Sequence, residues 1–427
     1  MRGLKKWFLV VAVVMSAAKS WGQAAPSPFT TYGVGEFYGT GLIQNQGTGT
    51  GVAQPQYWYI NNQNPALLVF NNMTVFQVGV IGESRTIKGD TTNEKNSGGN
   101  LNYIAMSFPV KIMKWTTSFG LMPYSNVDFS FQYPGYARDP SGAIVDTLVT
   151  KETGSGGLTQ VYWSNGVRLT KDLSVGLRAA YMFGPISNVY TNVLTTTPEQ
   201  GIPYLINIED KTNLKGFNFS VGVSYSKDSL GRRKDRRLSF GAVYSLKTRF
   251  NAKVQDRIYR MSLAGDTLEH YNLATSYGDV HLPESYTIGI AYGRGSRWNV
   301  SGEFFYQDWS KYTSIRSDDS GLSQTWRTAV GGEYTQDPYA LENYFKRITF
   351  RAGVSYQEYP YFANNARVKD YGINLGLSLP AGRSSVDLAA QFGKRGDKSV
   401  NELEESYFRI FFGITFNDTW FIKRKFD

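Results

Sequence analysis

Histidine, cysteine and serine are the residues whose chemistry would point most directly to catalysis. The chain of 427 residues has no cysteine, and its two histidines, His270 and His281, fall in one segment, 252–281, that we expect to be a loop. A thiol nucleophile and a cysteine-ligated metal are therefore excluded. A Ser–His hydrolase would need a histidine held beside a serine, which a loop does not provide. We predict that the protein is not an enzyme.

Cofactor and nucleic-acid sites are not indicated either. Asp318 and Asp319 stand in SDDSG, which is more typical of a solvated turn than of a calcium site. The glycine-rich run GTGLIQNQGTGTG lacks the lysine of a phosphate-binding loop. The net charge is +10, and residues 1–22, which are expected to be removed, carry four of these charges, so the remaining +6 is modest for this length and does not argue for nucleic acid. We predict no cofactor, no metal and no nucleic-acid partner.

The N-terminus predicts export. Arg2, Lys5 and Lys6 precede the short apolar run WFLVVAVVMSAA, and small residues flank a plausible cleavage site after Gly22. The run is too short to span a membrane as a helix, so residues 1–22 are expected to be a signal peptide. Without cysteine, an exported chain has no disulfides, and an extensive hydrogen-bonded structure must hold it together.

Alternation of apolar and polar residues is the dominant pattern from residue 73 onward. In GFNFSVGVSYS (216–226), Phe217 to Tyr225 supply an apolar residue at every second position, with small or polar residues between them. A period of two places alternate side chains on opposite faces of a strand. The composition, with 15% aromatic residues and 44 glycines, suits strands that are apolar on one face only.

About 14 such segments follow one another, each near the length that a tilted strand needs to cross a bilayer. Short connections alternate with long ones at 124–156, 186–211 and 252–281, which we expect to be loops. This alternation is typical of an outer-membrane barrel, with short turns and both termini in the periplasm. A soluble β-sandwich is the alternative, but its single core would have to absorb some 350 residues.

Residues 23–72 interrupt the pattern. They carry too many aromatic residues for an ordinary disordered tail, so a plug folded into the barrel lumen is the preferred interpretation. The predicted organisation is a signal peptide at 1–22, a hatch or plug at 23–72, an all-β transmembrane antiparallel barrel at 73–416 and a periplasmic tail at 417–427. The predicted location is the outer membrane of a Gram-negative cell.

Several short motifs match those of a known family. Asn64, Pro65 and Ala66 stand shortly before the first predicted strand, an arrangement that resembles the Asn-Pro-Ala motif of the FadL family of long-chain fatty-acid transporters. The stretch LPESYTIGIAYGRGSRWNVSGEFFYQDWSKY (282–312) resembles its proline-containing strand, tight turn and tryptophan-bearing strand. The segments RAGVSYQEYPYF, DYGINLGLSLP, GKRGD and GITFNDTWFIKRKFD are similar to FadL-like barrels of the Bacteroidetes type.

The resemblance implies passive uptake of hydrophobic, fatty-acid-like compounds through a plugged lumen with a lateral exit. Asn64, Pro65 and Ala66 would form the fixed elbow of the hatch. Gly120 and Pro123 are candidates for a kink at the exit, although Pro123 could equally begin the following loop. The candidates for the ligand pocket are Phe29, Tyr32 and Phe37, which could equally pack as plain plug core.

Partners other than the hydrophobic ligand are also considered. FadL-like barrels of this lineage include docking partners in protein secretion, so the resemblance also implies a periplasmic or secretion-system protein partner as the alternative function. An open structural pore is less well supported, because a plug would obstruct water. The basic run GRRKDRR (231–237) is expected in a short turn, where it is either solvated or in contact with membrane lipids or a periplasmic partner. Trp420 and Phe421 of the tail suit an interfacial anchor.

Overall fold

The computed structural model describes residues 24–89, 93–138, 140–194, 204–262, 264–315 and 321–419. The predicted signal peptide, Asp318, Asp319 and the tail from Trp420 onward lie outside the described residues. Within the described ranges, no helix is both long and apolar enough to cross a membrane.

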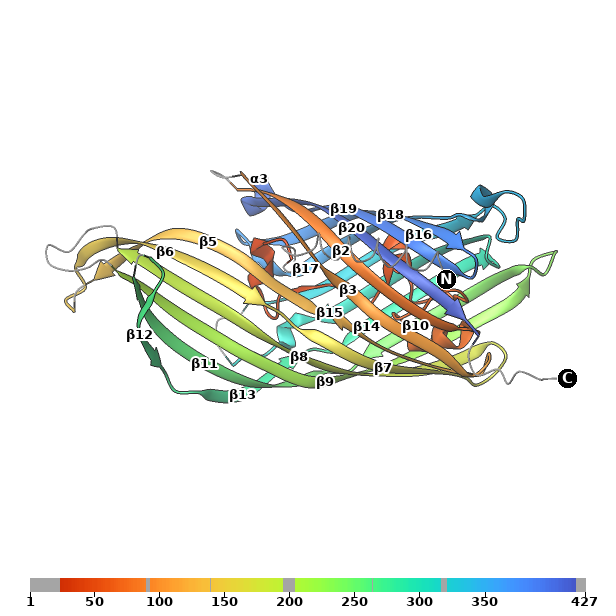
Figure 1. Ribbon diagram of the computed structural model, residues 1–427, viewed down its shortest axis with the longest axis horizontal. Coiled ribbons are helices and arrows are strands. Elements are labelled where there is room, and N and C mark those ends of the chain that lie inside the picture. Colours follow the sequence, from red (N-terminus) through yellow and green to blue (C-terminus); the bar gives the residue numbers. More distant parts are fainter. Residues whose placement is uncertain are drawn as a thin grey trace, which may run out of the picture.

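A closed antiparallel barrel of 14 strands forms the body of the molecule (Figure 1). In order around the wall, its strands are β2 (Thr74–Lys88), β3 (Asn93–Lys111), β4 (Trp115–Pro123), β7 (Thr159–Arg168), β8 (Leu173–Leu194), β9 (Tyr204–Leu230), β10 (Arg236–Ser245), β14 (Ser285–Arg294), β15 (Trp298–Asp308), β16 (Gln324–Thr335), β17 (Thr349–Ala363), β18 (Ala366–Ala381), β19 (Ser384–Asp397) and β20 (Leu403–Asp418). Pairing of β20 with β2, from Thr74 opposite Asp418, closes the ring. The predicted barrel is confirmed.

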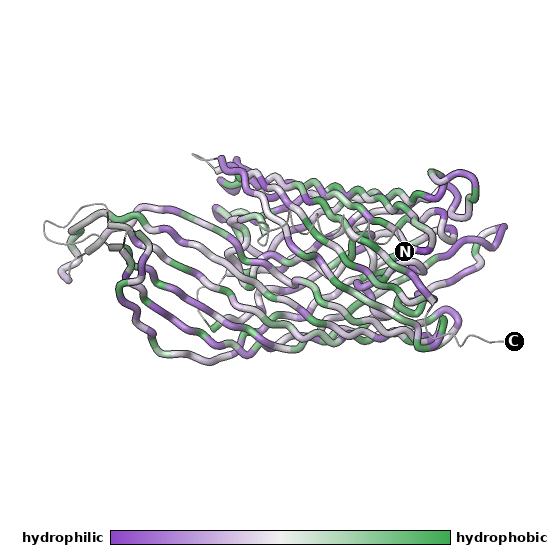
Figure 2. Tube along the Cα trace, in the orientation of Figure 1, coloured by the Kyte–Doolittle hydropathy of each residue, from purple (hydrophilic) through white to green (hydrophobic). Residues whose placement is uncertain are grey.

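The two faces of the wall follow the sequence alternation. In β9, Phe217 is 60% exposed and Val221 is 41% exposed on the outside, whereas Ser220 and Ser224 are buried on the lumen side. Figure 2 shows hydrophobic residues recurring along the strands of the barrel and largely hydrophilic turns at its ends. Because a closed ring leaves no unpaired strand edge, such an apolar band can face lipid.

The two ends of the barrel differ. At the short-turn end, most connections take only a few residues, as between β3 and β4, β9 and β10, or β14 and β15. The exception is the β16–β17 turn, which contains the 3₁₀ helix η5 (Tyr344–Arg347). At the opposite, extended end lie η3 (Trp309–Lys311), after β15, and α3 (Lys398–Asn401), between β19 and β20.

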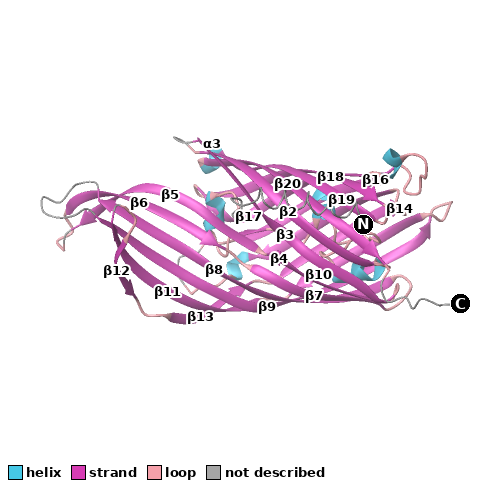
Figure 3. Ribbon diagram, viewed as in Figure 1, coloured by secondary structure: helices cyan, strands magenta, loops and turns pink. Residues whose placement is uncertain are grey.

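The extended end carries an ordered sheet where the sequence predicts long loops (Figure 3). Strands β8 and β9 run on beyond the barrel, where β8 pairs with β6 (Ile144–Gly156) and β9 pairs with β11 (Thr248–Ser262). Strand β5 (Ser125–Arg138) pairs with β6, and β12 (Thr267–Asn272) and β13 (Ser276–Leu282) pair with β11. The prediction of loops at 124–156, 186–211 and 252–281 is therefore wrong. Alternation marks these segments less clearly, as in β12, whose six residues are all exposed and leave no buried face.

The N-terminal segment, residues 24–72, lies inside the ring. Its short elements are η1 (Pro28–Thr31), β1 (Glu36–Phe37), α2 (Ile43–Thr48) and η2 (Pro65–Phe70). Helix α2 contacts β16 to β20, and η2 contacts β4, β7, β8 and β9 on the other side of the lumen. Most side chains of the segment are buried. Its action as a hatch stays a prediction.

Candidate functional site

The Asn64-Pro65-Ala66 motif forms a rigid elbow. The Asn64 side chain caps η2 by accepting a hydrogen bond from the Ala66 amide (3.0 Å). Its Nδ2 donates to the carbonyl of Val52 within the segment (2.8 Å) and to that of Val223 in β9 (3.1 Å). Proline at the first helical position needs no amide partner. The motif therefore fixes the fold of the segment and attaches it to the wall.

Two wall glycines make room for this elbow. A Cβ on Gly222 of β9 would lie 2.8 Å from Pro65 Cδ, and one on Gly176 of β8 would lie 2.7 Å from the Pro65 carbonyl oxygen. A Cβ on Gly166 of β7 would lie 2.5 Å from the same carbonyl oxygen. No side chain fits between wall and elbow, because such separations are far inside van der Waals contact. The segment is thus seated on the backbone of three neighbouring strands.

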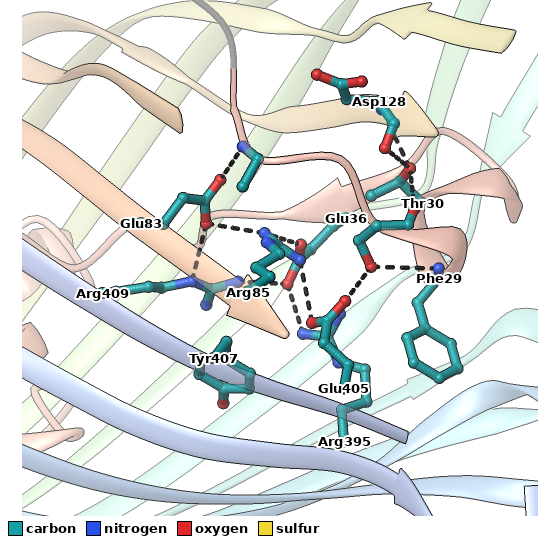
Figure 4. Close-up of polar contacts among 12 residues, drawn as sticks. Phe29, Thr30, Glu36, Glu83, Arg85, Asp128, Arg395, Glu405, Tyr407 and Arg409 are labelled. Carbon is teal, nitrogen blue, oxygen red and sulfur yellow. Dashed lines mark hydrogen bonds and ion pairs between the residues drawn. The ribbon is translucent and has the colours of Figure 1, made fainter. Parts of the chain in front are cut away.

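A second attachment is electrostatic and involves Glu36 of β1. Its carboxylate accepts hydrogen bonds from Arg85 of β2 (2.7 Å), Arg395 of β19 (2.5 Å) and Arg409 of β20 (2.6 Å). Figure 4 shows these guanidinium groups converging on Glu36 from the strands around it. All four side chains are largely buried. Strand β1 is therefore tied to the wall by three charge-assisted contacts.

The carboxylates that balance the arginines come from the wall. Glu83 contacts Arg85 and Arg409, Glu405 contacts Arg85 and Arg395, and Asp370 contacts Arg395. Ser27 of the segment donates its hydroxyl to Glu405, and Glu83 accepts from the Ala25 amide (2.8 Å). The network therefore holds two further points of the segment besides Glu36.

The arginines determine the ionisation of Glu36. Burial opposes the charged form, but Arg395, Arg85 and Arg409 outweigh it and hold the pKa of this carboxyl well below its usual range. Glu36 therefore stays ionised throughout the physiological pH range, and its three contacts persist with it.

The N-terminal segment also occupies an interruption in wall pairing. In the described part of the chain, β3 pairs with β4 only from Ile104 onward, and its preceding residues pair with β2 alone. Across this interruption, β5 pairs with β1 instead of β3. The Ser27 amide and the Thr30 hydroxyl donate to the Asp128 carbonyl of β5, and Asn96 of β3 donates to the Pro26 carbonyl (3.3 Å). Residues 25–37 thus lie between β3 and β5.

Gly120 and Pro123 border this interruption. Pro123 is the last residue of β4, two residues beyond the last pair with β3, and it remains paired with Thr159 of β7. Gly120 lies within the paired part, and a Cβ there would lie 2.8 Å from the Tyr162 hydroxyl. Gly120 therefore accommodates the buried Tyr162, and Pro123 ends the strand where β4 gives way to β5.

A cavity of about 360 Å³ lies between the segment and the wall. Phe29, Tyr32 and Phe37 all line it. Tyr32 stacks on Tyr361 of β17 with ring centroids 4.4 Å apart, and Phe37 packs against Trp309 (5.4 Å). The three aromatic residues singled out in the sequence therefore lie together at one cavity, and their role in binding stays a prediction.

The polar lining of the cavity includes Arg178 of β8. This buried guanidinium donates to the Asn62 carbonyl (3.1 Å) and to Gln160 Oε1 (3.0 Å), and it lies over the ring of Tyr162. Among the described residues it contacts no carboxylate. A buried cation with only neutral partners can take an anionic group.

The charged network is the part of the site that sequence reasoning missed. Its strand residues stand at lumen-facing positions, as Arg409 does between the lipid-facing Phe408 and Ile410, and charge at such positions was an available signal. Arg178 carries the same signal, because it stands next to the outward-facing Leu177. Glu36 had no comparable signal, because its partners are distant in the sequence. Phe29, Tyr32 and Phe37, the pocket candidates of the sequence analysis, line the cavity, and their part in binding stays a prediction.

We expect Gly176→Ala and Gly222→Ala to lift the elbow from the wall, because each added methyl group would overlap Pro65 or Asn64. The overpacking should lower the free energy of unfolding by about 1–3 kcal/mol. It should also expose residues 24–72 to limited proteolysis. Gly302→Ala in β15 is the control, since nothing lies closer than 3.9 Å to its added Cβ. If residues 24–72 were equally protected from proteolysis in all three variants, the proposed contact of the elbow with Gly176 and Gly222 would be contradicted.

Glu36→Gln should detach β1, because it leaves three buried guanidinium groups short of a carboxylate. Removing one partner of a buried ion pair costs about 3–5 kcal/mol. Glu269→Gln, which breaks the exposed pair with Arg260, should cost about 0–1 kcal/mol. Urea unfolding of both variants measures the difference, and equal values would show that the network does not hold the segment.

The pH dependence of the Glu36 contribution follows from its lowered pKa. Its contribution to stability is fully present above the unfolded pKa of about 4.3 and is lost only as the pH falls through the lower folded value. The Glu36→Gln effect should therefore be the same at pH 7 and pH 5. A loss of stability on Glu36→Gln that is only half as large at pH 5 as at pH 7 would contradict this prediction.

Comparisons with known proteins agree with the barrel. No curated protein matches the sequence. The solved CymD monoaromatic hydrocarbon channel superimposes with a TM-score of 0.57 at 14% identity, covering 91% of this chain and 99% of that one. The toluene transporter TbuX of Ralstonia pickettii gives 0.56 at 17% identity, covering 90% and 98%. A FadL homologue of Pseudomonas aeruginosa gives 0.55 at 13% identity, covering 89% and 98%.

The structural matches establish the fold, which is that of FadL-type barrels, with strands in the same closed arrangement. The family model described as BamG matches residues 4–427, which is nearly the whole chain. The protein is an integral outer-membrane barrel of FadL type and belongs to the BamG family.

Proposed function

We propose that the protein takes up a hydrophobic or amphipathic compound, fatty-acid-like in its chemistry, into the lumen cavity and releases it sideways through the wall. The observation that carries the proposal is the aromatic cavity between the N-terminal segment and the barrel. Its volume of about 360 Å³ lies in the range of small-molecule sites. The hydrocarbon channels and FadL homologue named above share the fold, which is consistent with such a ligand.

The binding energy would come from the hydrophobic effect. Burial of an alkyl chain contributes about 0.8 kcal/mol for each CH₂ group removed from water. The rings of Tyr32, Tyr361 and Trp309 offer a surface for such a chain. An anionic head group would meet Arg178, whose present partners are neutral. An amphiphile thus has both an apolar wall and a cation available in one cavity.

Release would use the interruption between β3 and β5, with the extended end facing outside. Gly120 and Pro123 stand at its edge, and residues 25–37 occupy it. The elbow at Asn64, Pro65 and Ala66 would stay fixed while the preceding residues move. In this proposal the ties of Glu36, Ser27 and Ala25 to the wall determine how readily the path opens.

Docking of a secretion partner is the second candidate function, and one observation favours it. The predicted loops form an ordered sheet whose outer strand β12 is exposed along its whole length. Leu268, Tyr271, Leu273 and Tyr277 are each at least half exposed there. Ordered exposed aromatic residues are typical of protein interfaces. This candidate requires no ligand and no movement of the segment.

Filling the cavity should abolish ligand binding. Thr287 of β14 lines the cavity, and its neighbour Ile288 faces outward. We expect Thr287→Trp to lower the affinity for dodecanoate at least tenfold, because the indole would displace the chain. Ile288→Trp, on the lipid side, should bind as the wild type does. Native mass spectrometry of the purified protein with added dodecanoate or toluene measures both.

The two candidate functions give different outcomes in this experiment. Wild-type protein that binds neither compound contradicts uptake. If it instead retains a co-purifying protein that Tyr271→Ser and Tyr277→Ser release, the docking function is supported. Binding that Thr287→Trp leaves intact would place the ligand outside this cavity.

Locking the interruption should block release without blocking binding. Because the chain has no cysteine, Pro26→Cys with Asn96→Cys gives a single pair across the gap. We expect the oxidised variant, reconstituted in vesicles, to bind dodecanoate but not to transfer it to the bilayer, and reduction to restore transfer. A control pair at Tyr292 and Val300, on strands that are already paired, should have no effect. Transfer by the oxidised variant would contradict lateral release at this position.

A further inference from the structure

The short-turn end carries a basic arc that neither candidate function uses. Three turns that are neighbours around the ring form it, namely residues 231–235 between β9 and β10, residues 295–297 between β14 and β15, and residues 336–348 between β16 and β17. In Figure 1 the last of these, drawn in blue, projects past the strand ends. The arc covers almost half of this rim.

Of the acidic side chains in and beside the arc, Glu342 of the β16–β17 turn is exposed and makes no ion pair among the described residues, whereas the others are engaged. Asp235 pairs with Arg294 (2.5 Å), Asp337 with Arg297 (3.7 Å), and Asp228 with Arg237. Arg232, Arg233 and Lys234 are exposed at the apex of the β9–β10 turn and contact no carboxylate within the described residues. Three unneutralised cations thus stand together at this position of the rim.

The β16–β17 turn adds an apolar surface beside these cations. Tyr339 is 74% exposed, Leu341 is 96% exposed and Phe345 is 77% exposed. This turn joins β16 and β17, which carry Tyr334 and Phe350 at their ends next to the turn. Both residues belong to the outward-facing apolar band of the barrel. The exposed apolar side chains therefore continue the lipid-facing band beyond the strand ends. Leaving such side chains in water is unfavourable, since each loses the gain from burial.

We propose that this arc binds the head groups of anionic phospholipids in the leaflet at the short-turn end. The Arg232–Lys234 run would contact the phosphates, and Leu341 and Phe345 would enter the acyl boundary. Aromatic residues with adjacent Lys and Arg are characteristic of the membrane–water interface. Basic residues near an anionic leaflet each strengthen its binding severalfold. An acidic protein would suit the cations but not the continuity of the apolar residues with the lipid-facing band.

The test compares lipid binding by the full-length mature protein and two charge variants. Native mass spectrometry from nanodiscs of phosphatidylglycerol and phosphatidylethanolamine counts the lipids retained. Arg232→Gln with Arg233→Gln and Lys234→Gln should lower the retention of phosphatidylglycerol at least about tenfold, with phosphatidylethanolamine unchanged. The control removes three exposed charges elsewhere on the rim, by Lys111→Gln, Lys114→Gln and Lys171→Gln, and should keep the preference.

A fluorophore tests the apolar contact. Because the chain has no cysteine, Leu341→Cys gives one labelling site, and Ser296→Cys gives a matched site in the neighbouring turn. The label at 341 should be quenched by spin-labelled acyl chains and shielded from iodide, whereas the label at 296 should be open to iodide.

Several outcomes would overturn the proposal. These are equal retention of both lipids by the wild type, a preference that survives the triple substitution, and a label at 341 that iodide quenches and lipid does not. Inorganic phosphate that displaces phosphatidylglycerol completely would indicate a phosphate site instead. A co-purifying protein that is lost with the triple variant, while lipid retention is unchanged, would indicate a protein interface.

Discussion

Close contact between the backbone of the elbow and the barrel wall is the constraint on which the site depends. Pro65 lies against Gly176 and Gly222 with no room for a methyl group, and Asn64 hydrogen-bonds the wall beside it. Backbone contacts of this kind define position more sharply than side-chain packing, because no rotamer change can absorb a displacement. The cavity is lined by the N-terminal segment together with the wall, so its shape depends on this fixed point.

The buried charges of the lumen contribute differently from the close packing at the elbow. Burying Glu36 with Arg85, Arg395 and Arg409 gains little net stability over an apolar cluster, because desolvation offsets the attraction. What such a network does provide is geometric specificity, since each carboxylate oxygen accepts from defined donors. Strand β1 is therefore held in one register against β5, at the place where the wall would otherwise be open.

Much of the architecture could be predicted from the sequence, since a lipid-facing strand must be apolar at every second residue. Phe217 to Tyr225 illustrate this, and the count of strands followed from the same rule. The sheet beyond the barrel could not be predicted in this way. Strands such as β12 face water on both sides, so no alternation distinguishes them from loops. Asn64, Pro65 and Ala66 were identified by resemblance. The wall glycines on which they pack could not be predicted, because these lie more than a hundred residues away in the sequence.

The order of the elements along the chain has a consequence for biogenesis. The segment that fills the lumen is made first, whereas the wall closes only when β20 reaches β2, with Asp418 opposite Thr74. The seat of Pro65 on Gly176 and Gly222 exists only once β8 and β9 have paired, so the segment reaches its final contact with the wall during or after the assembly of these strands. Folding that depends on so distant a contact is expected to be slow.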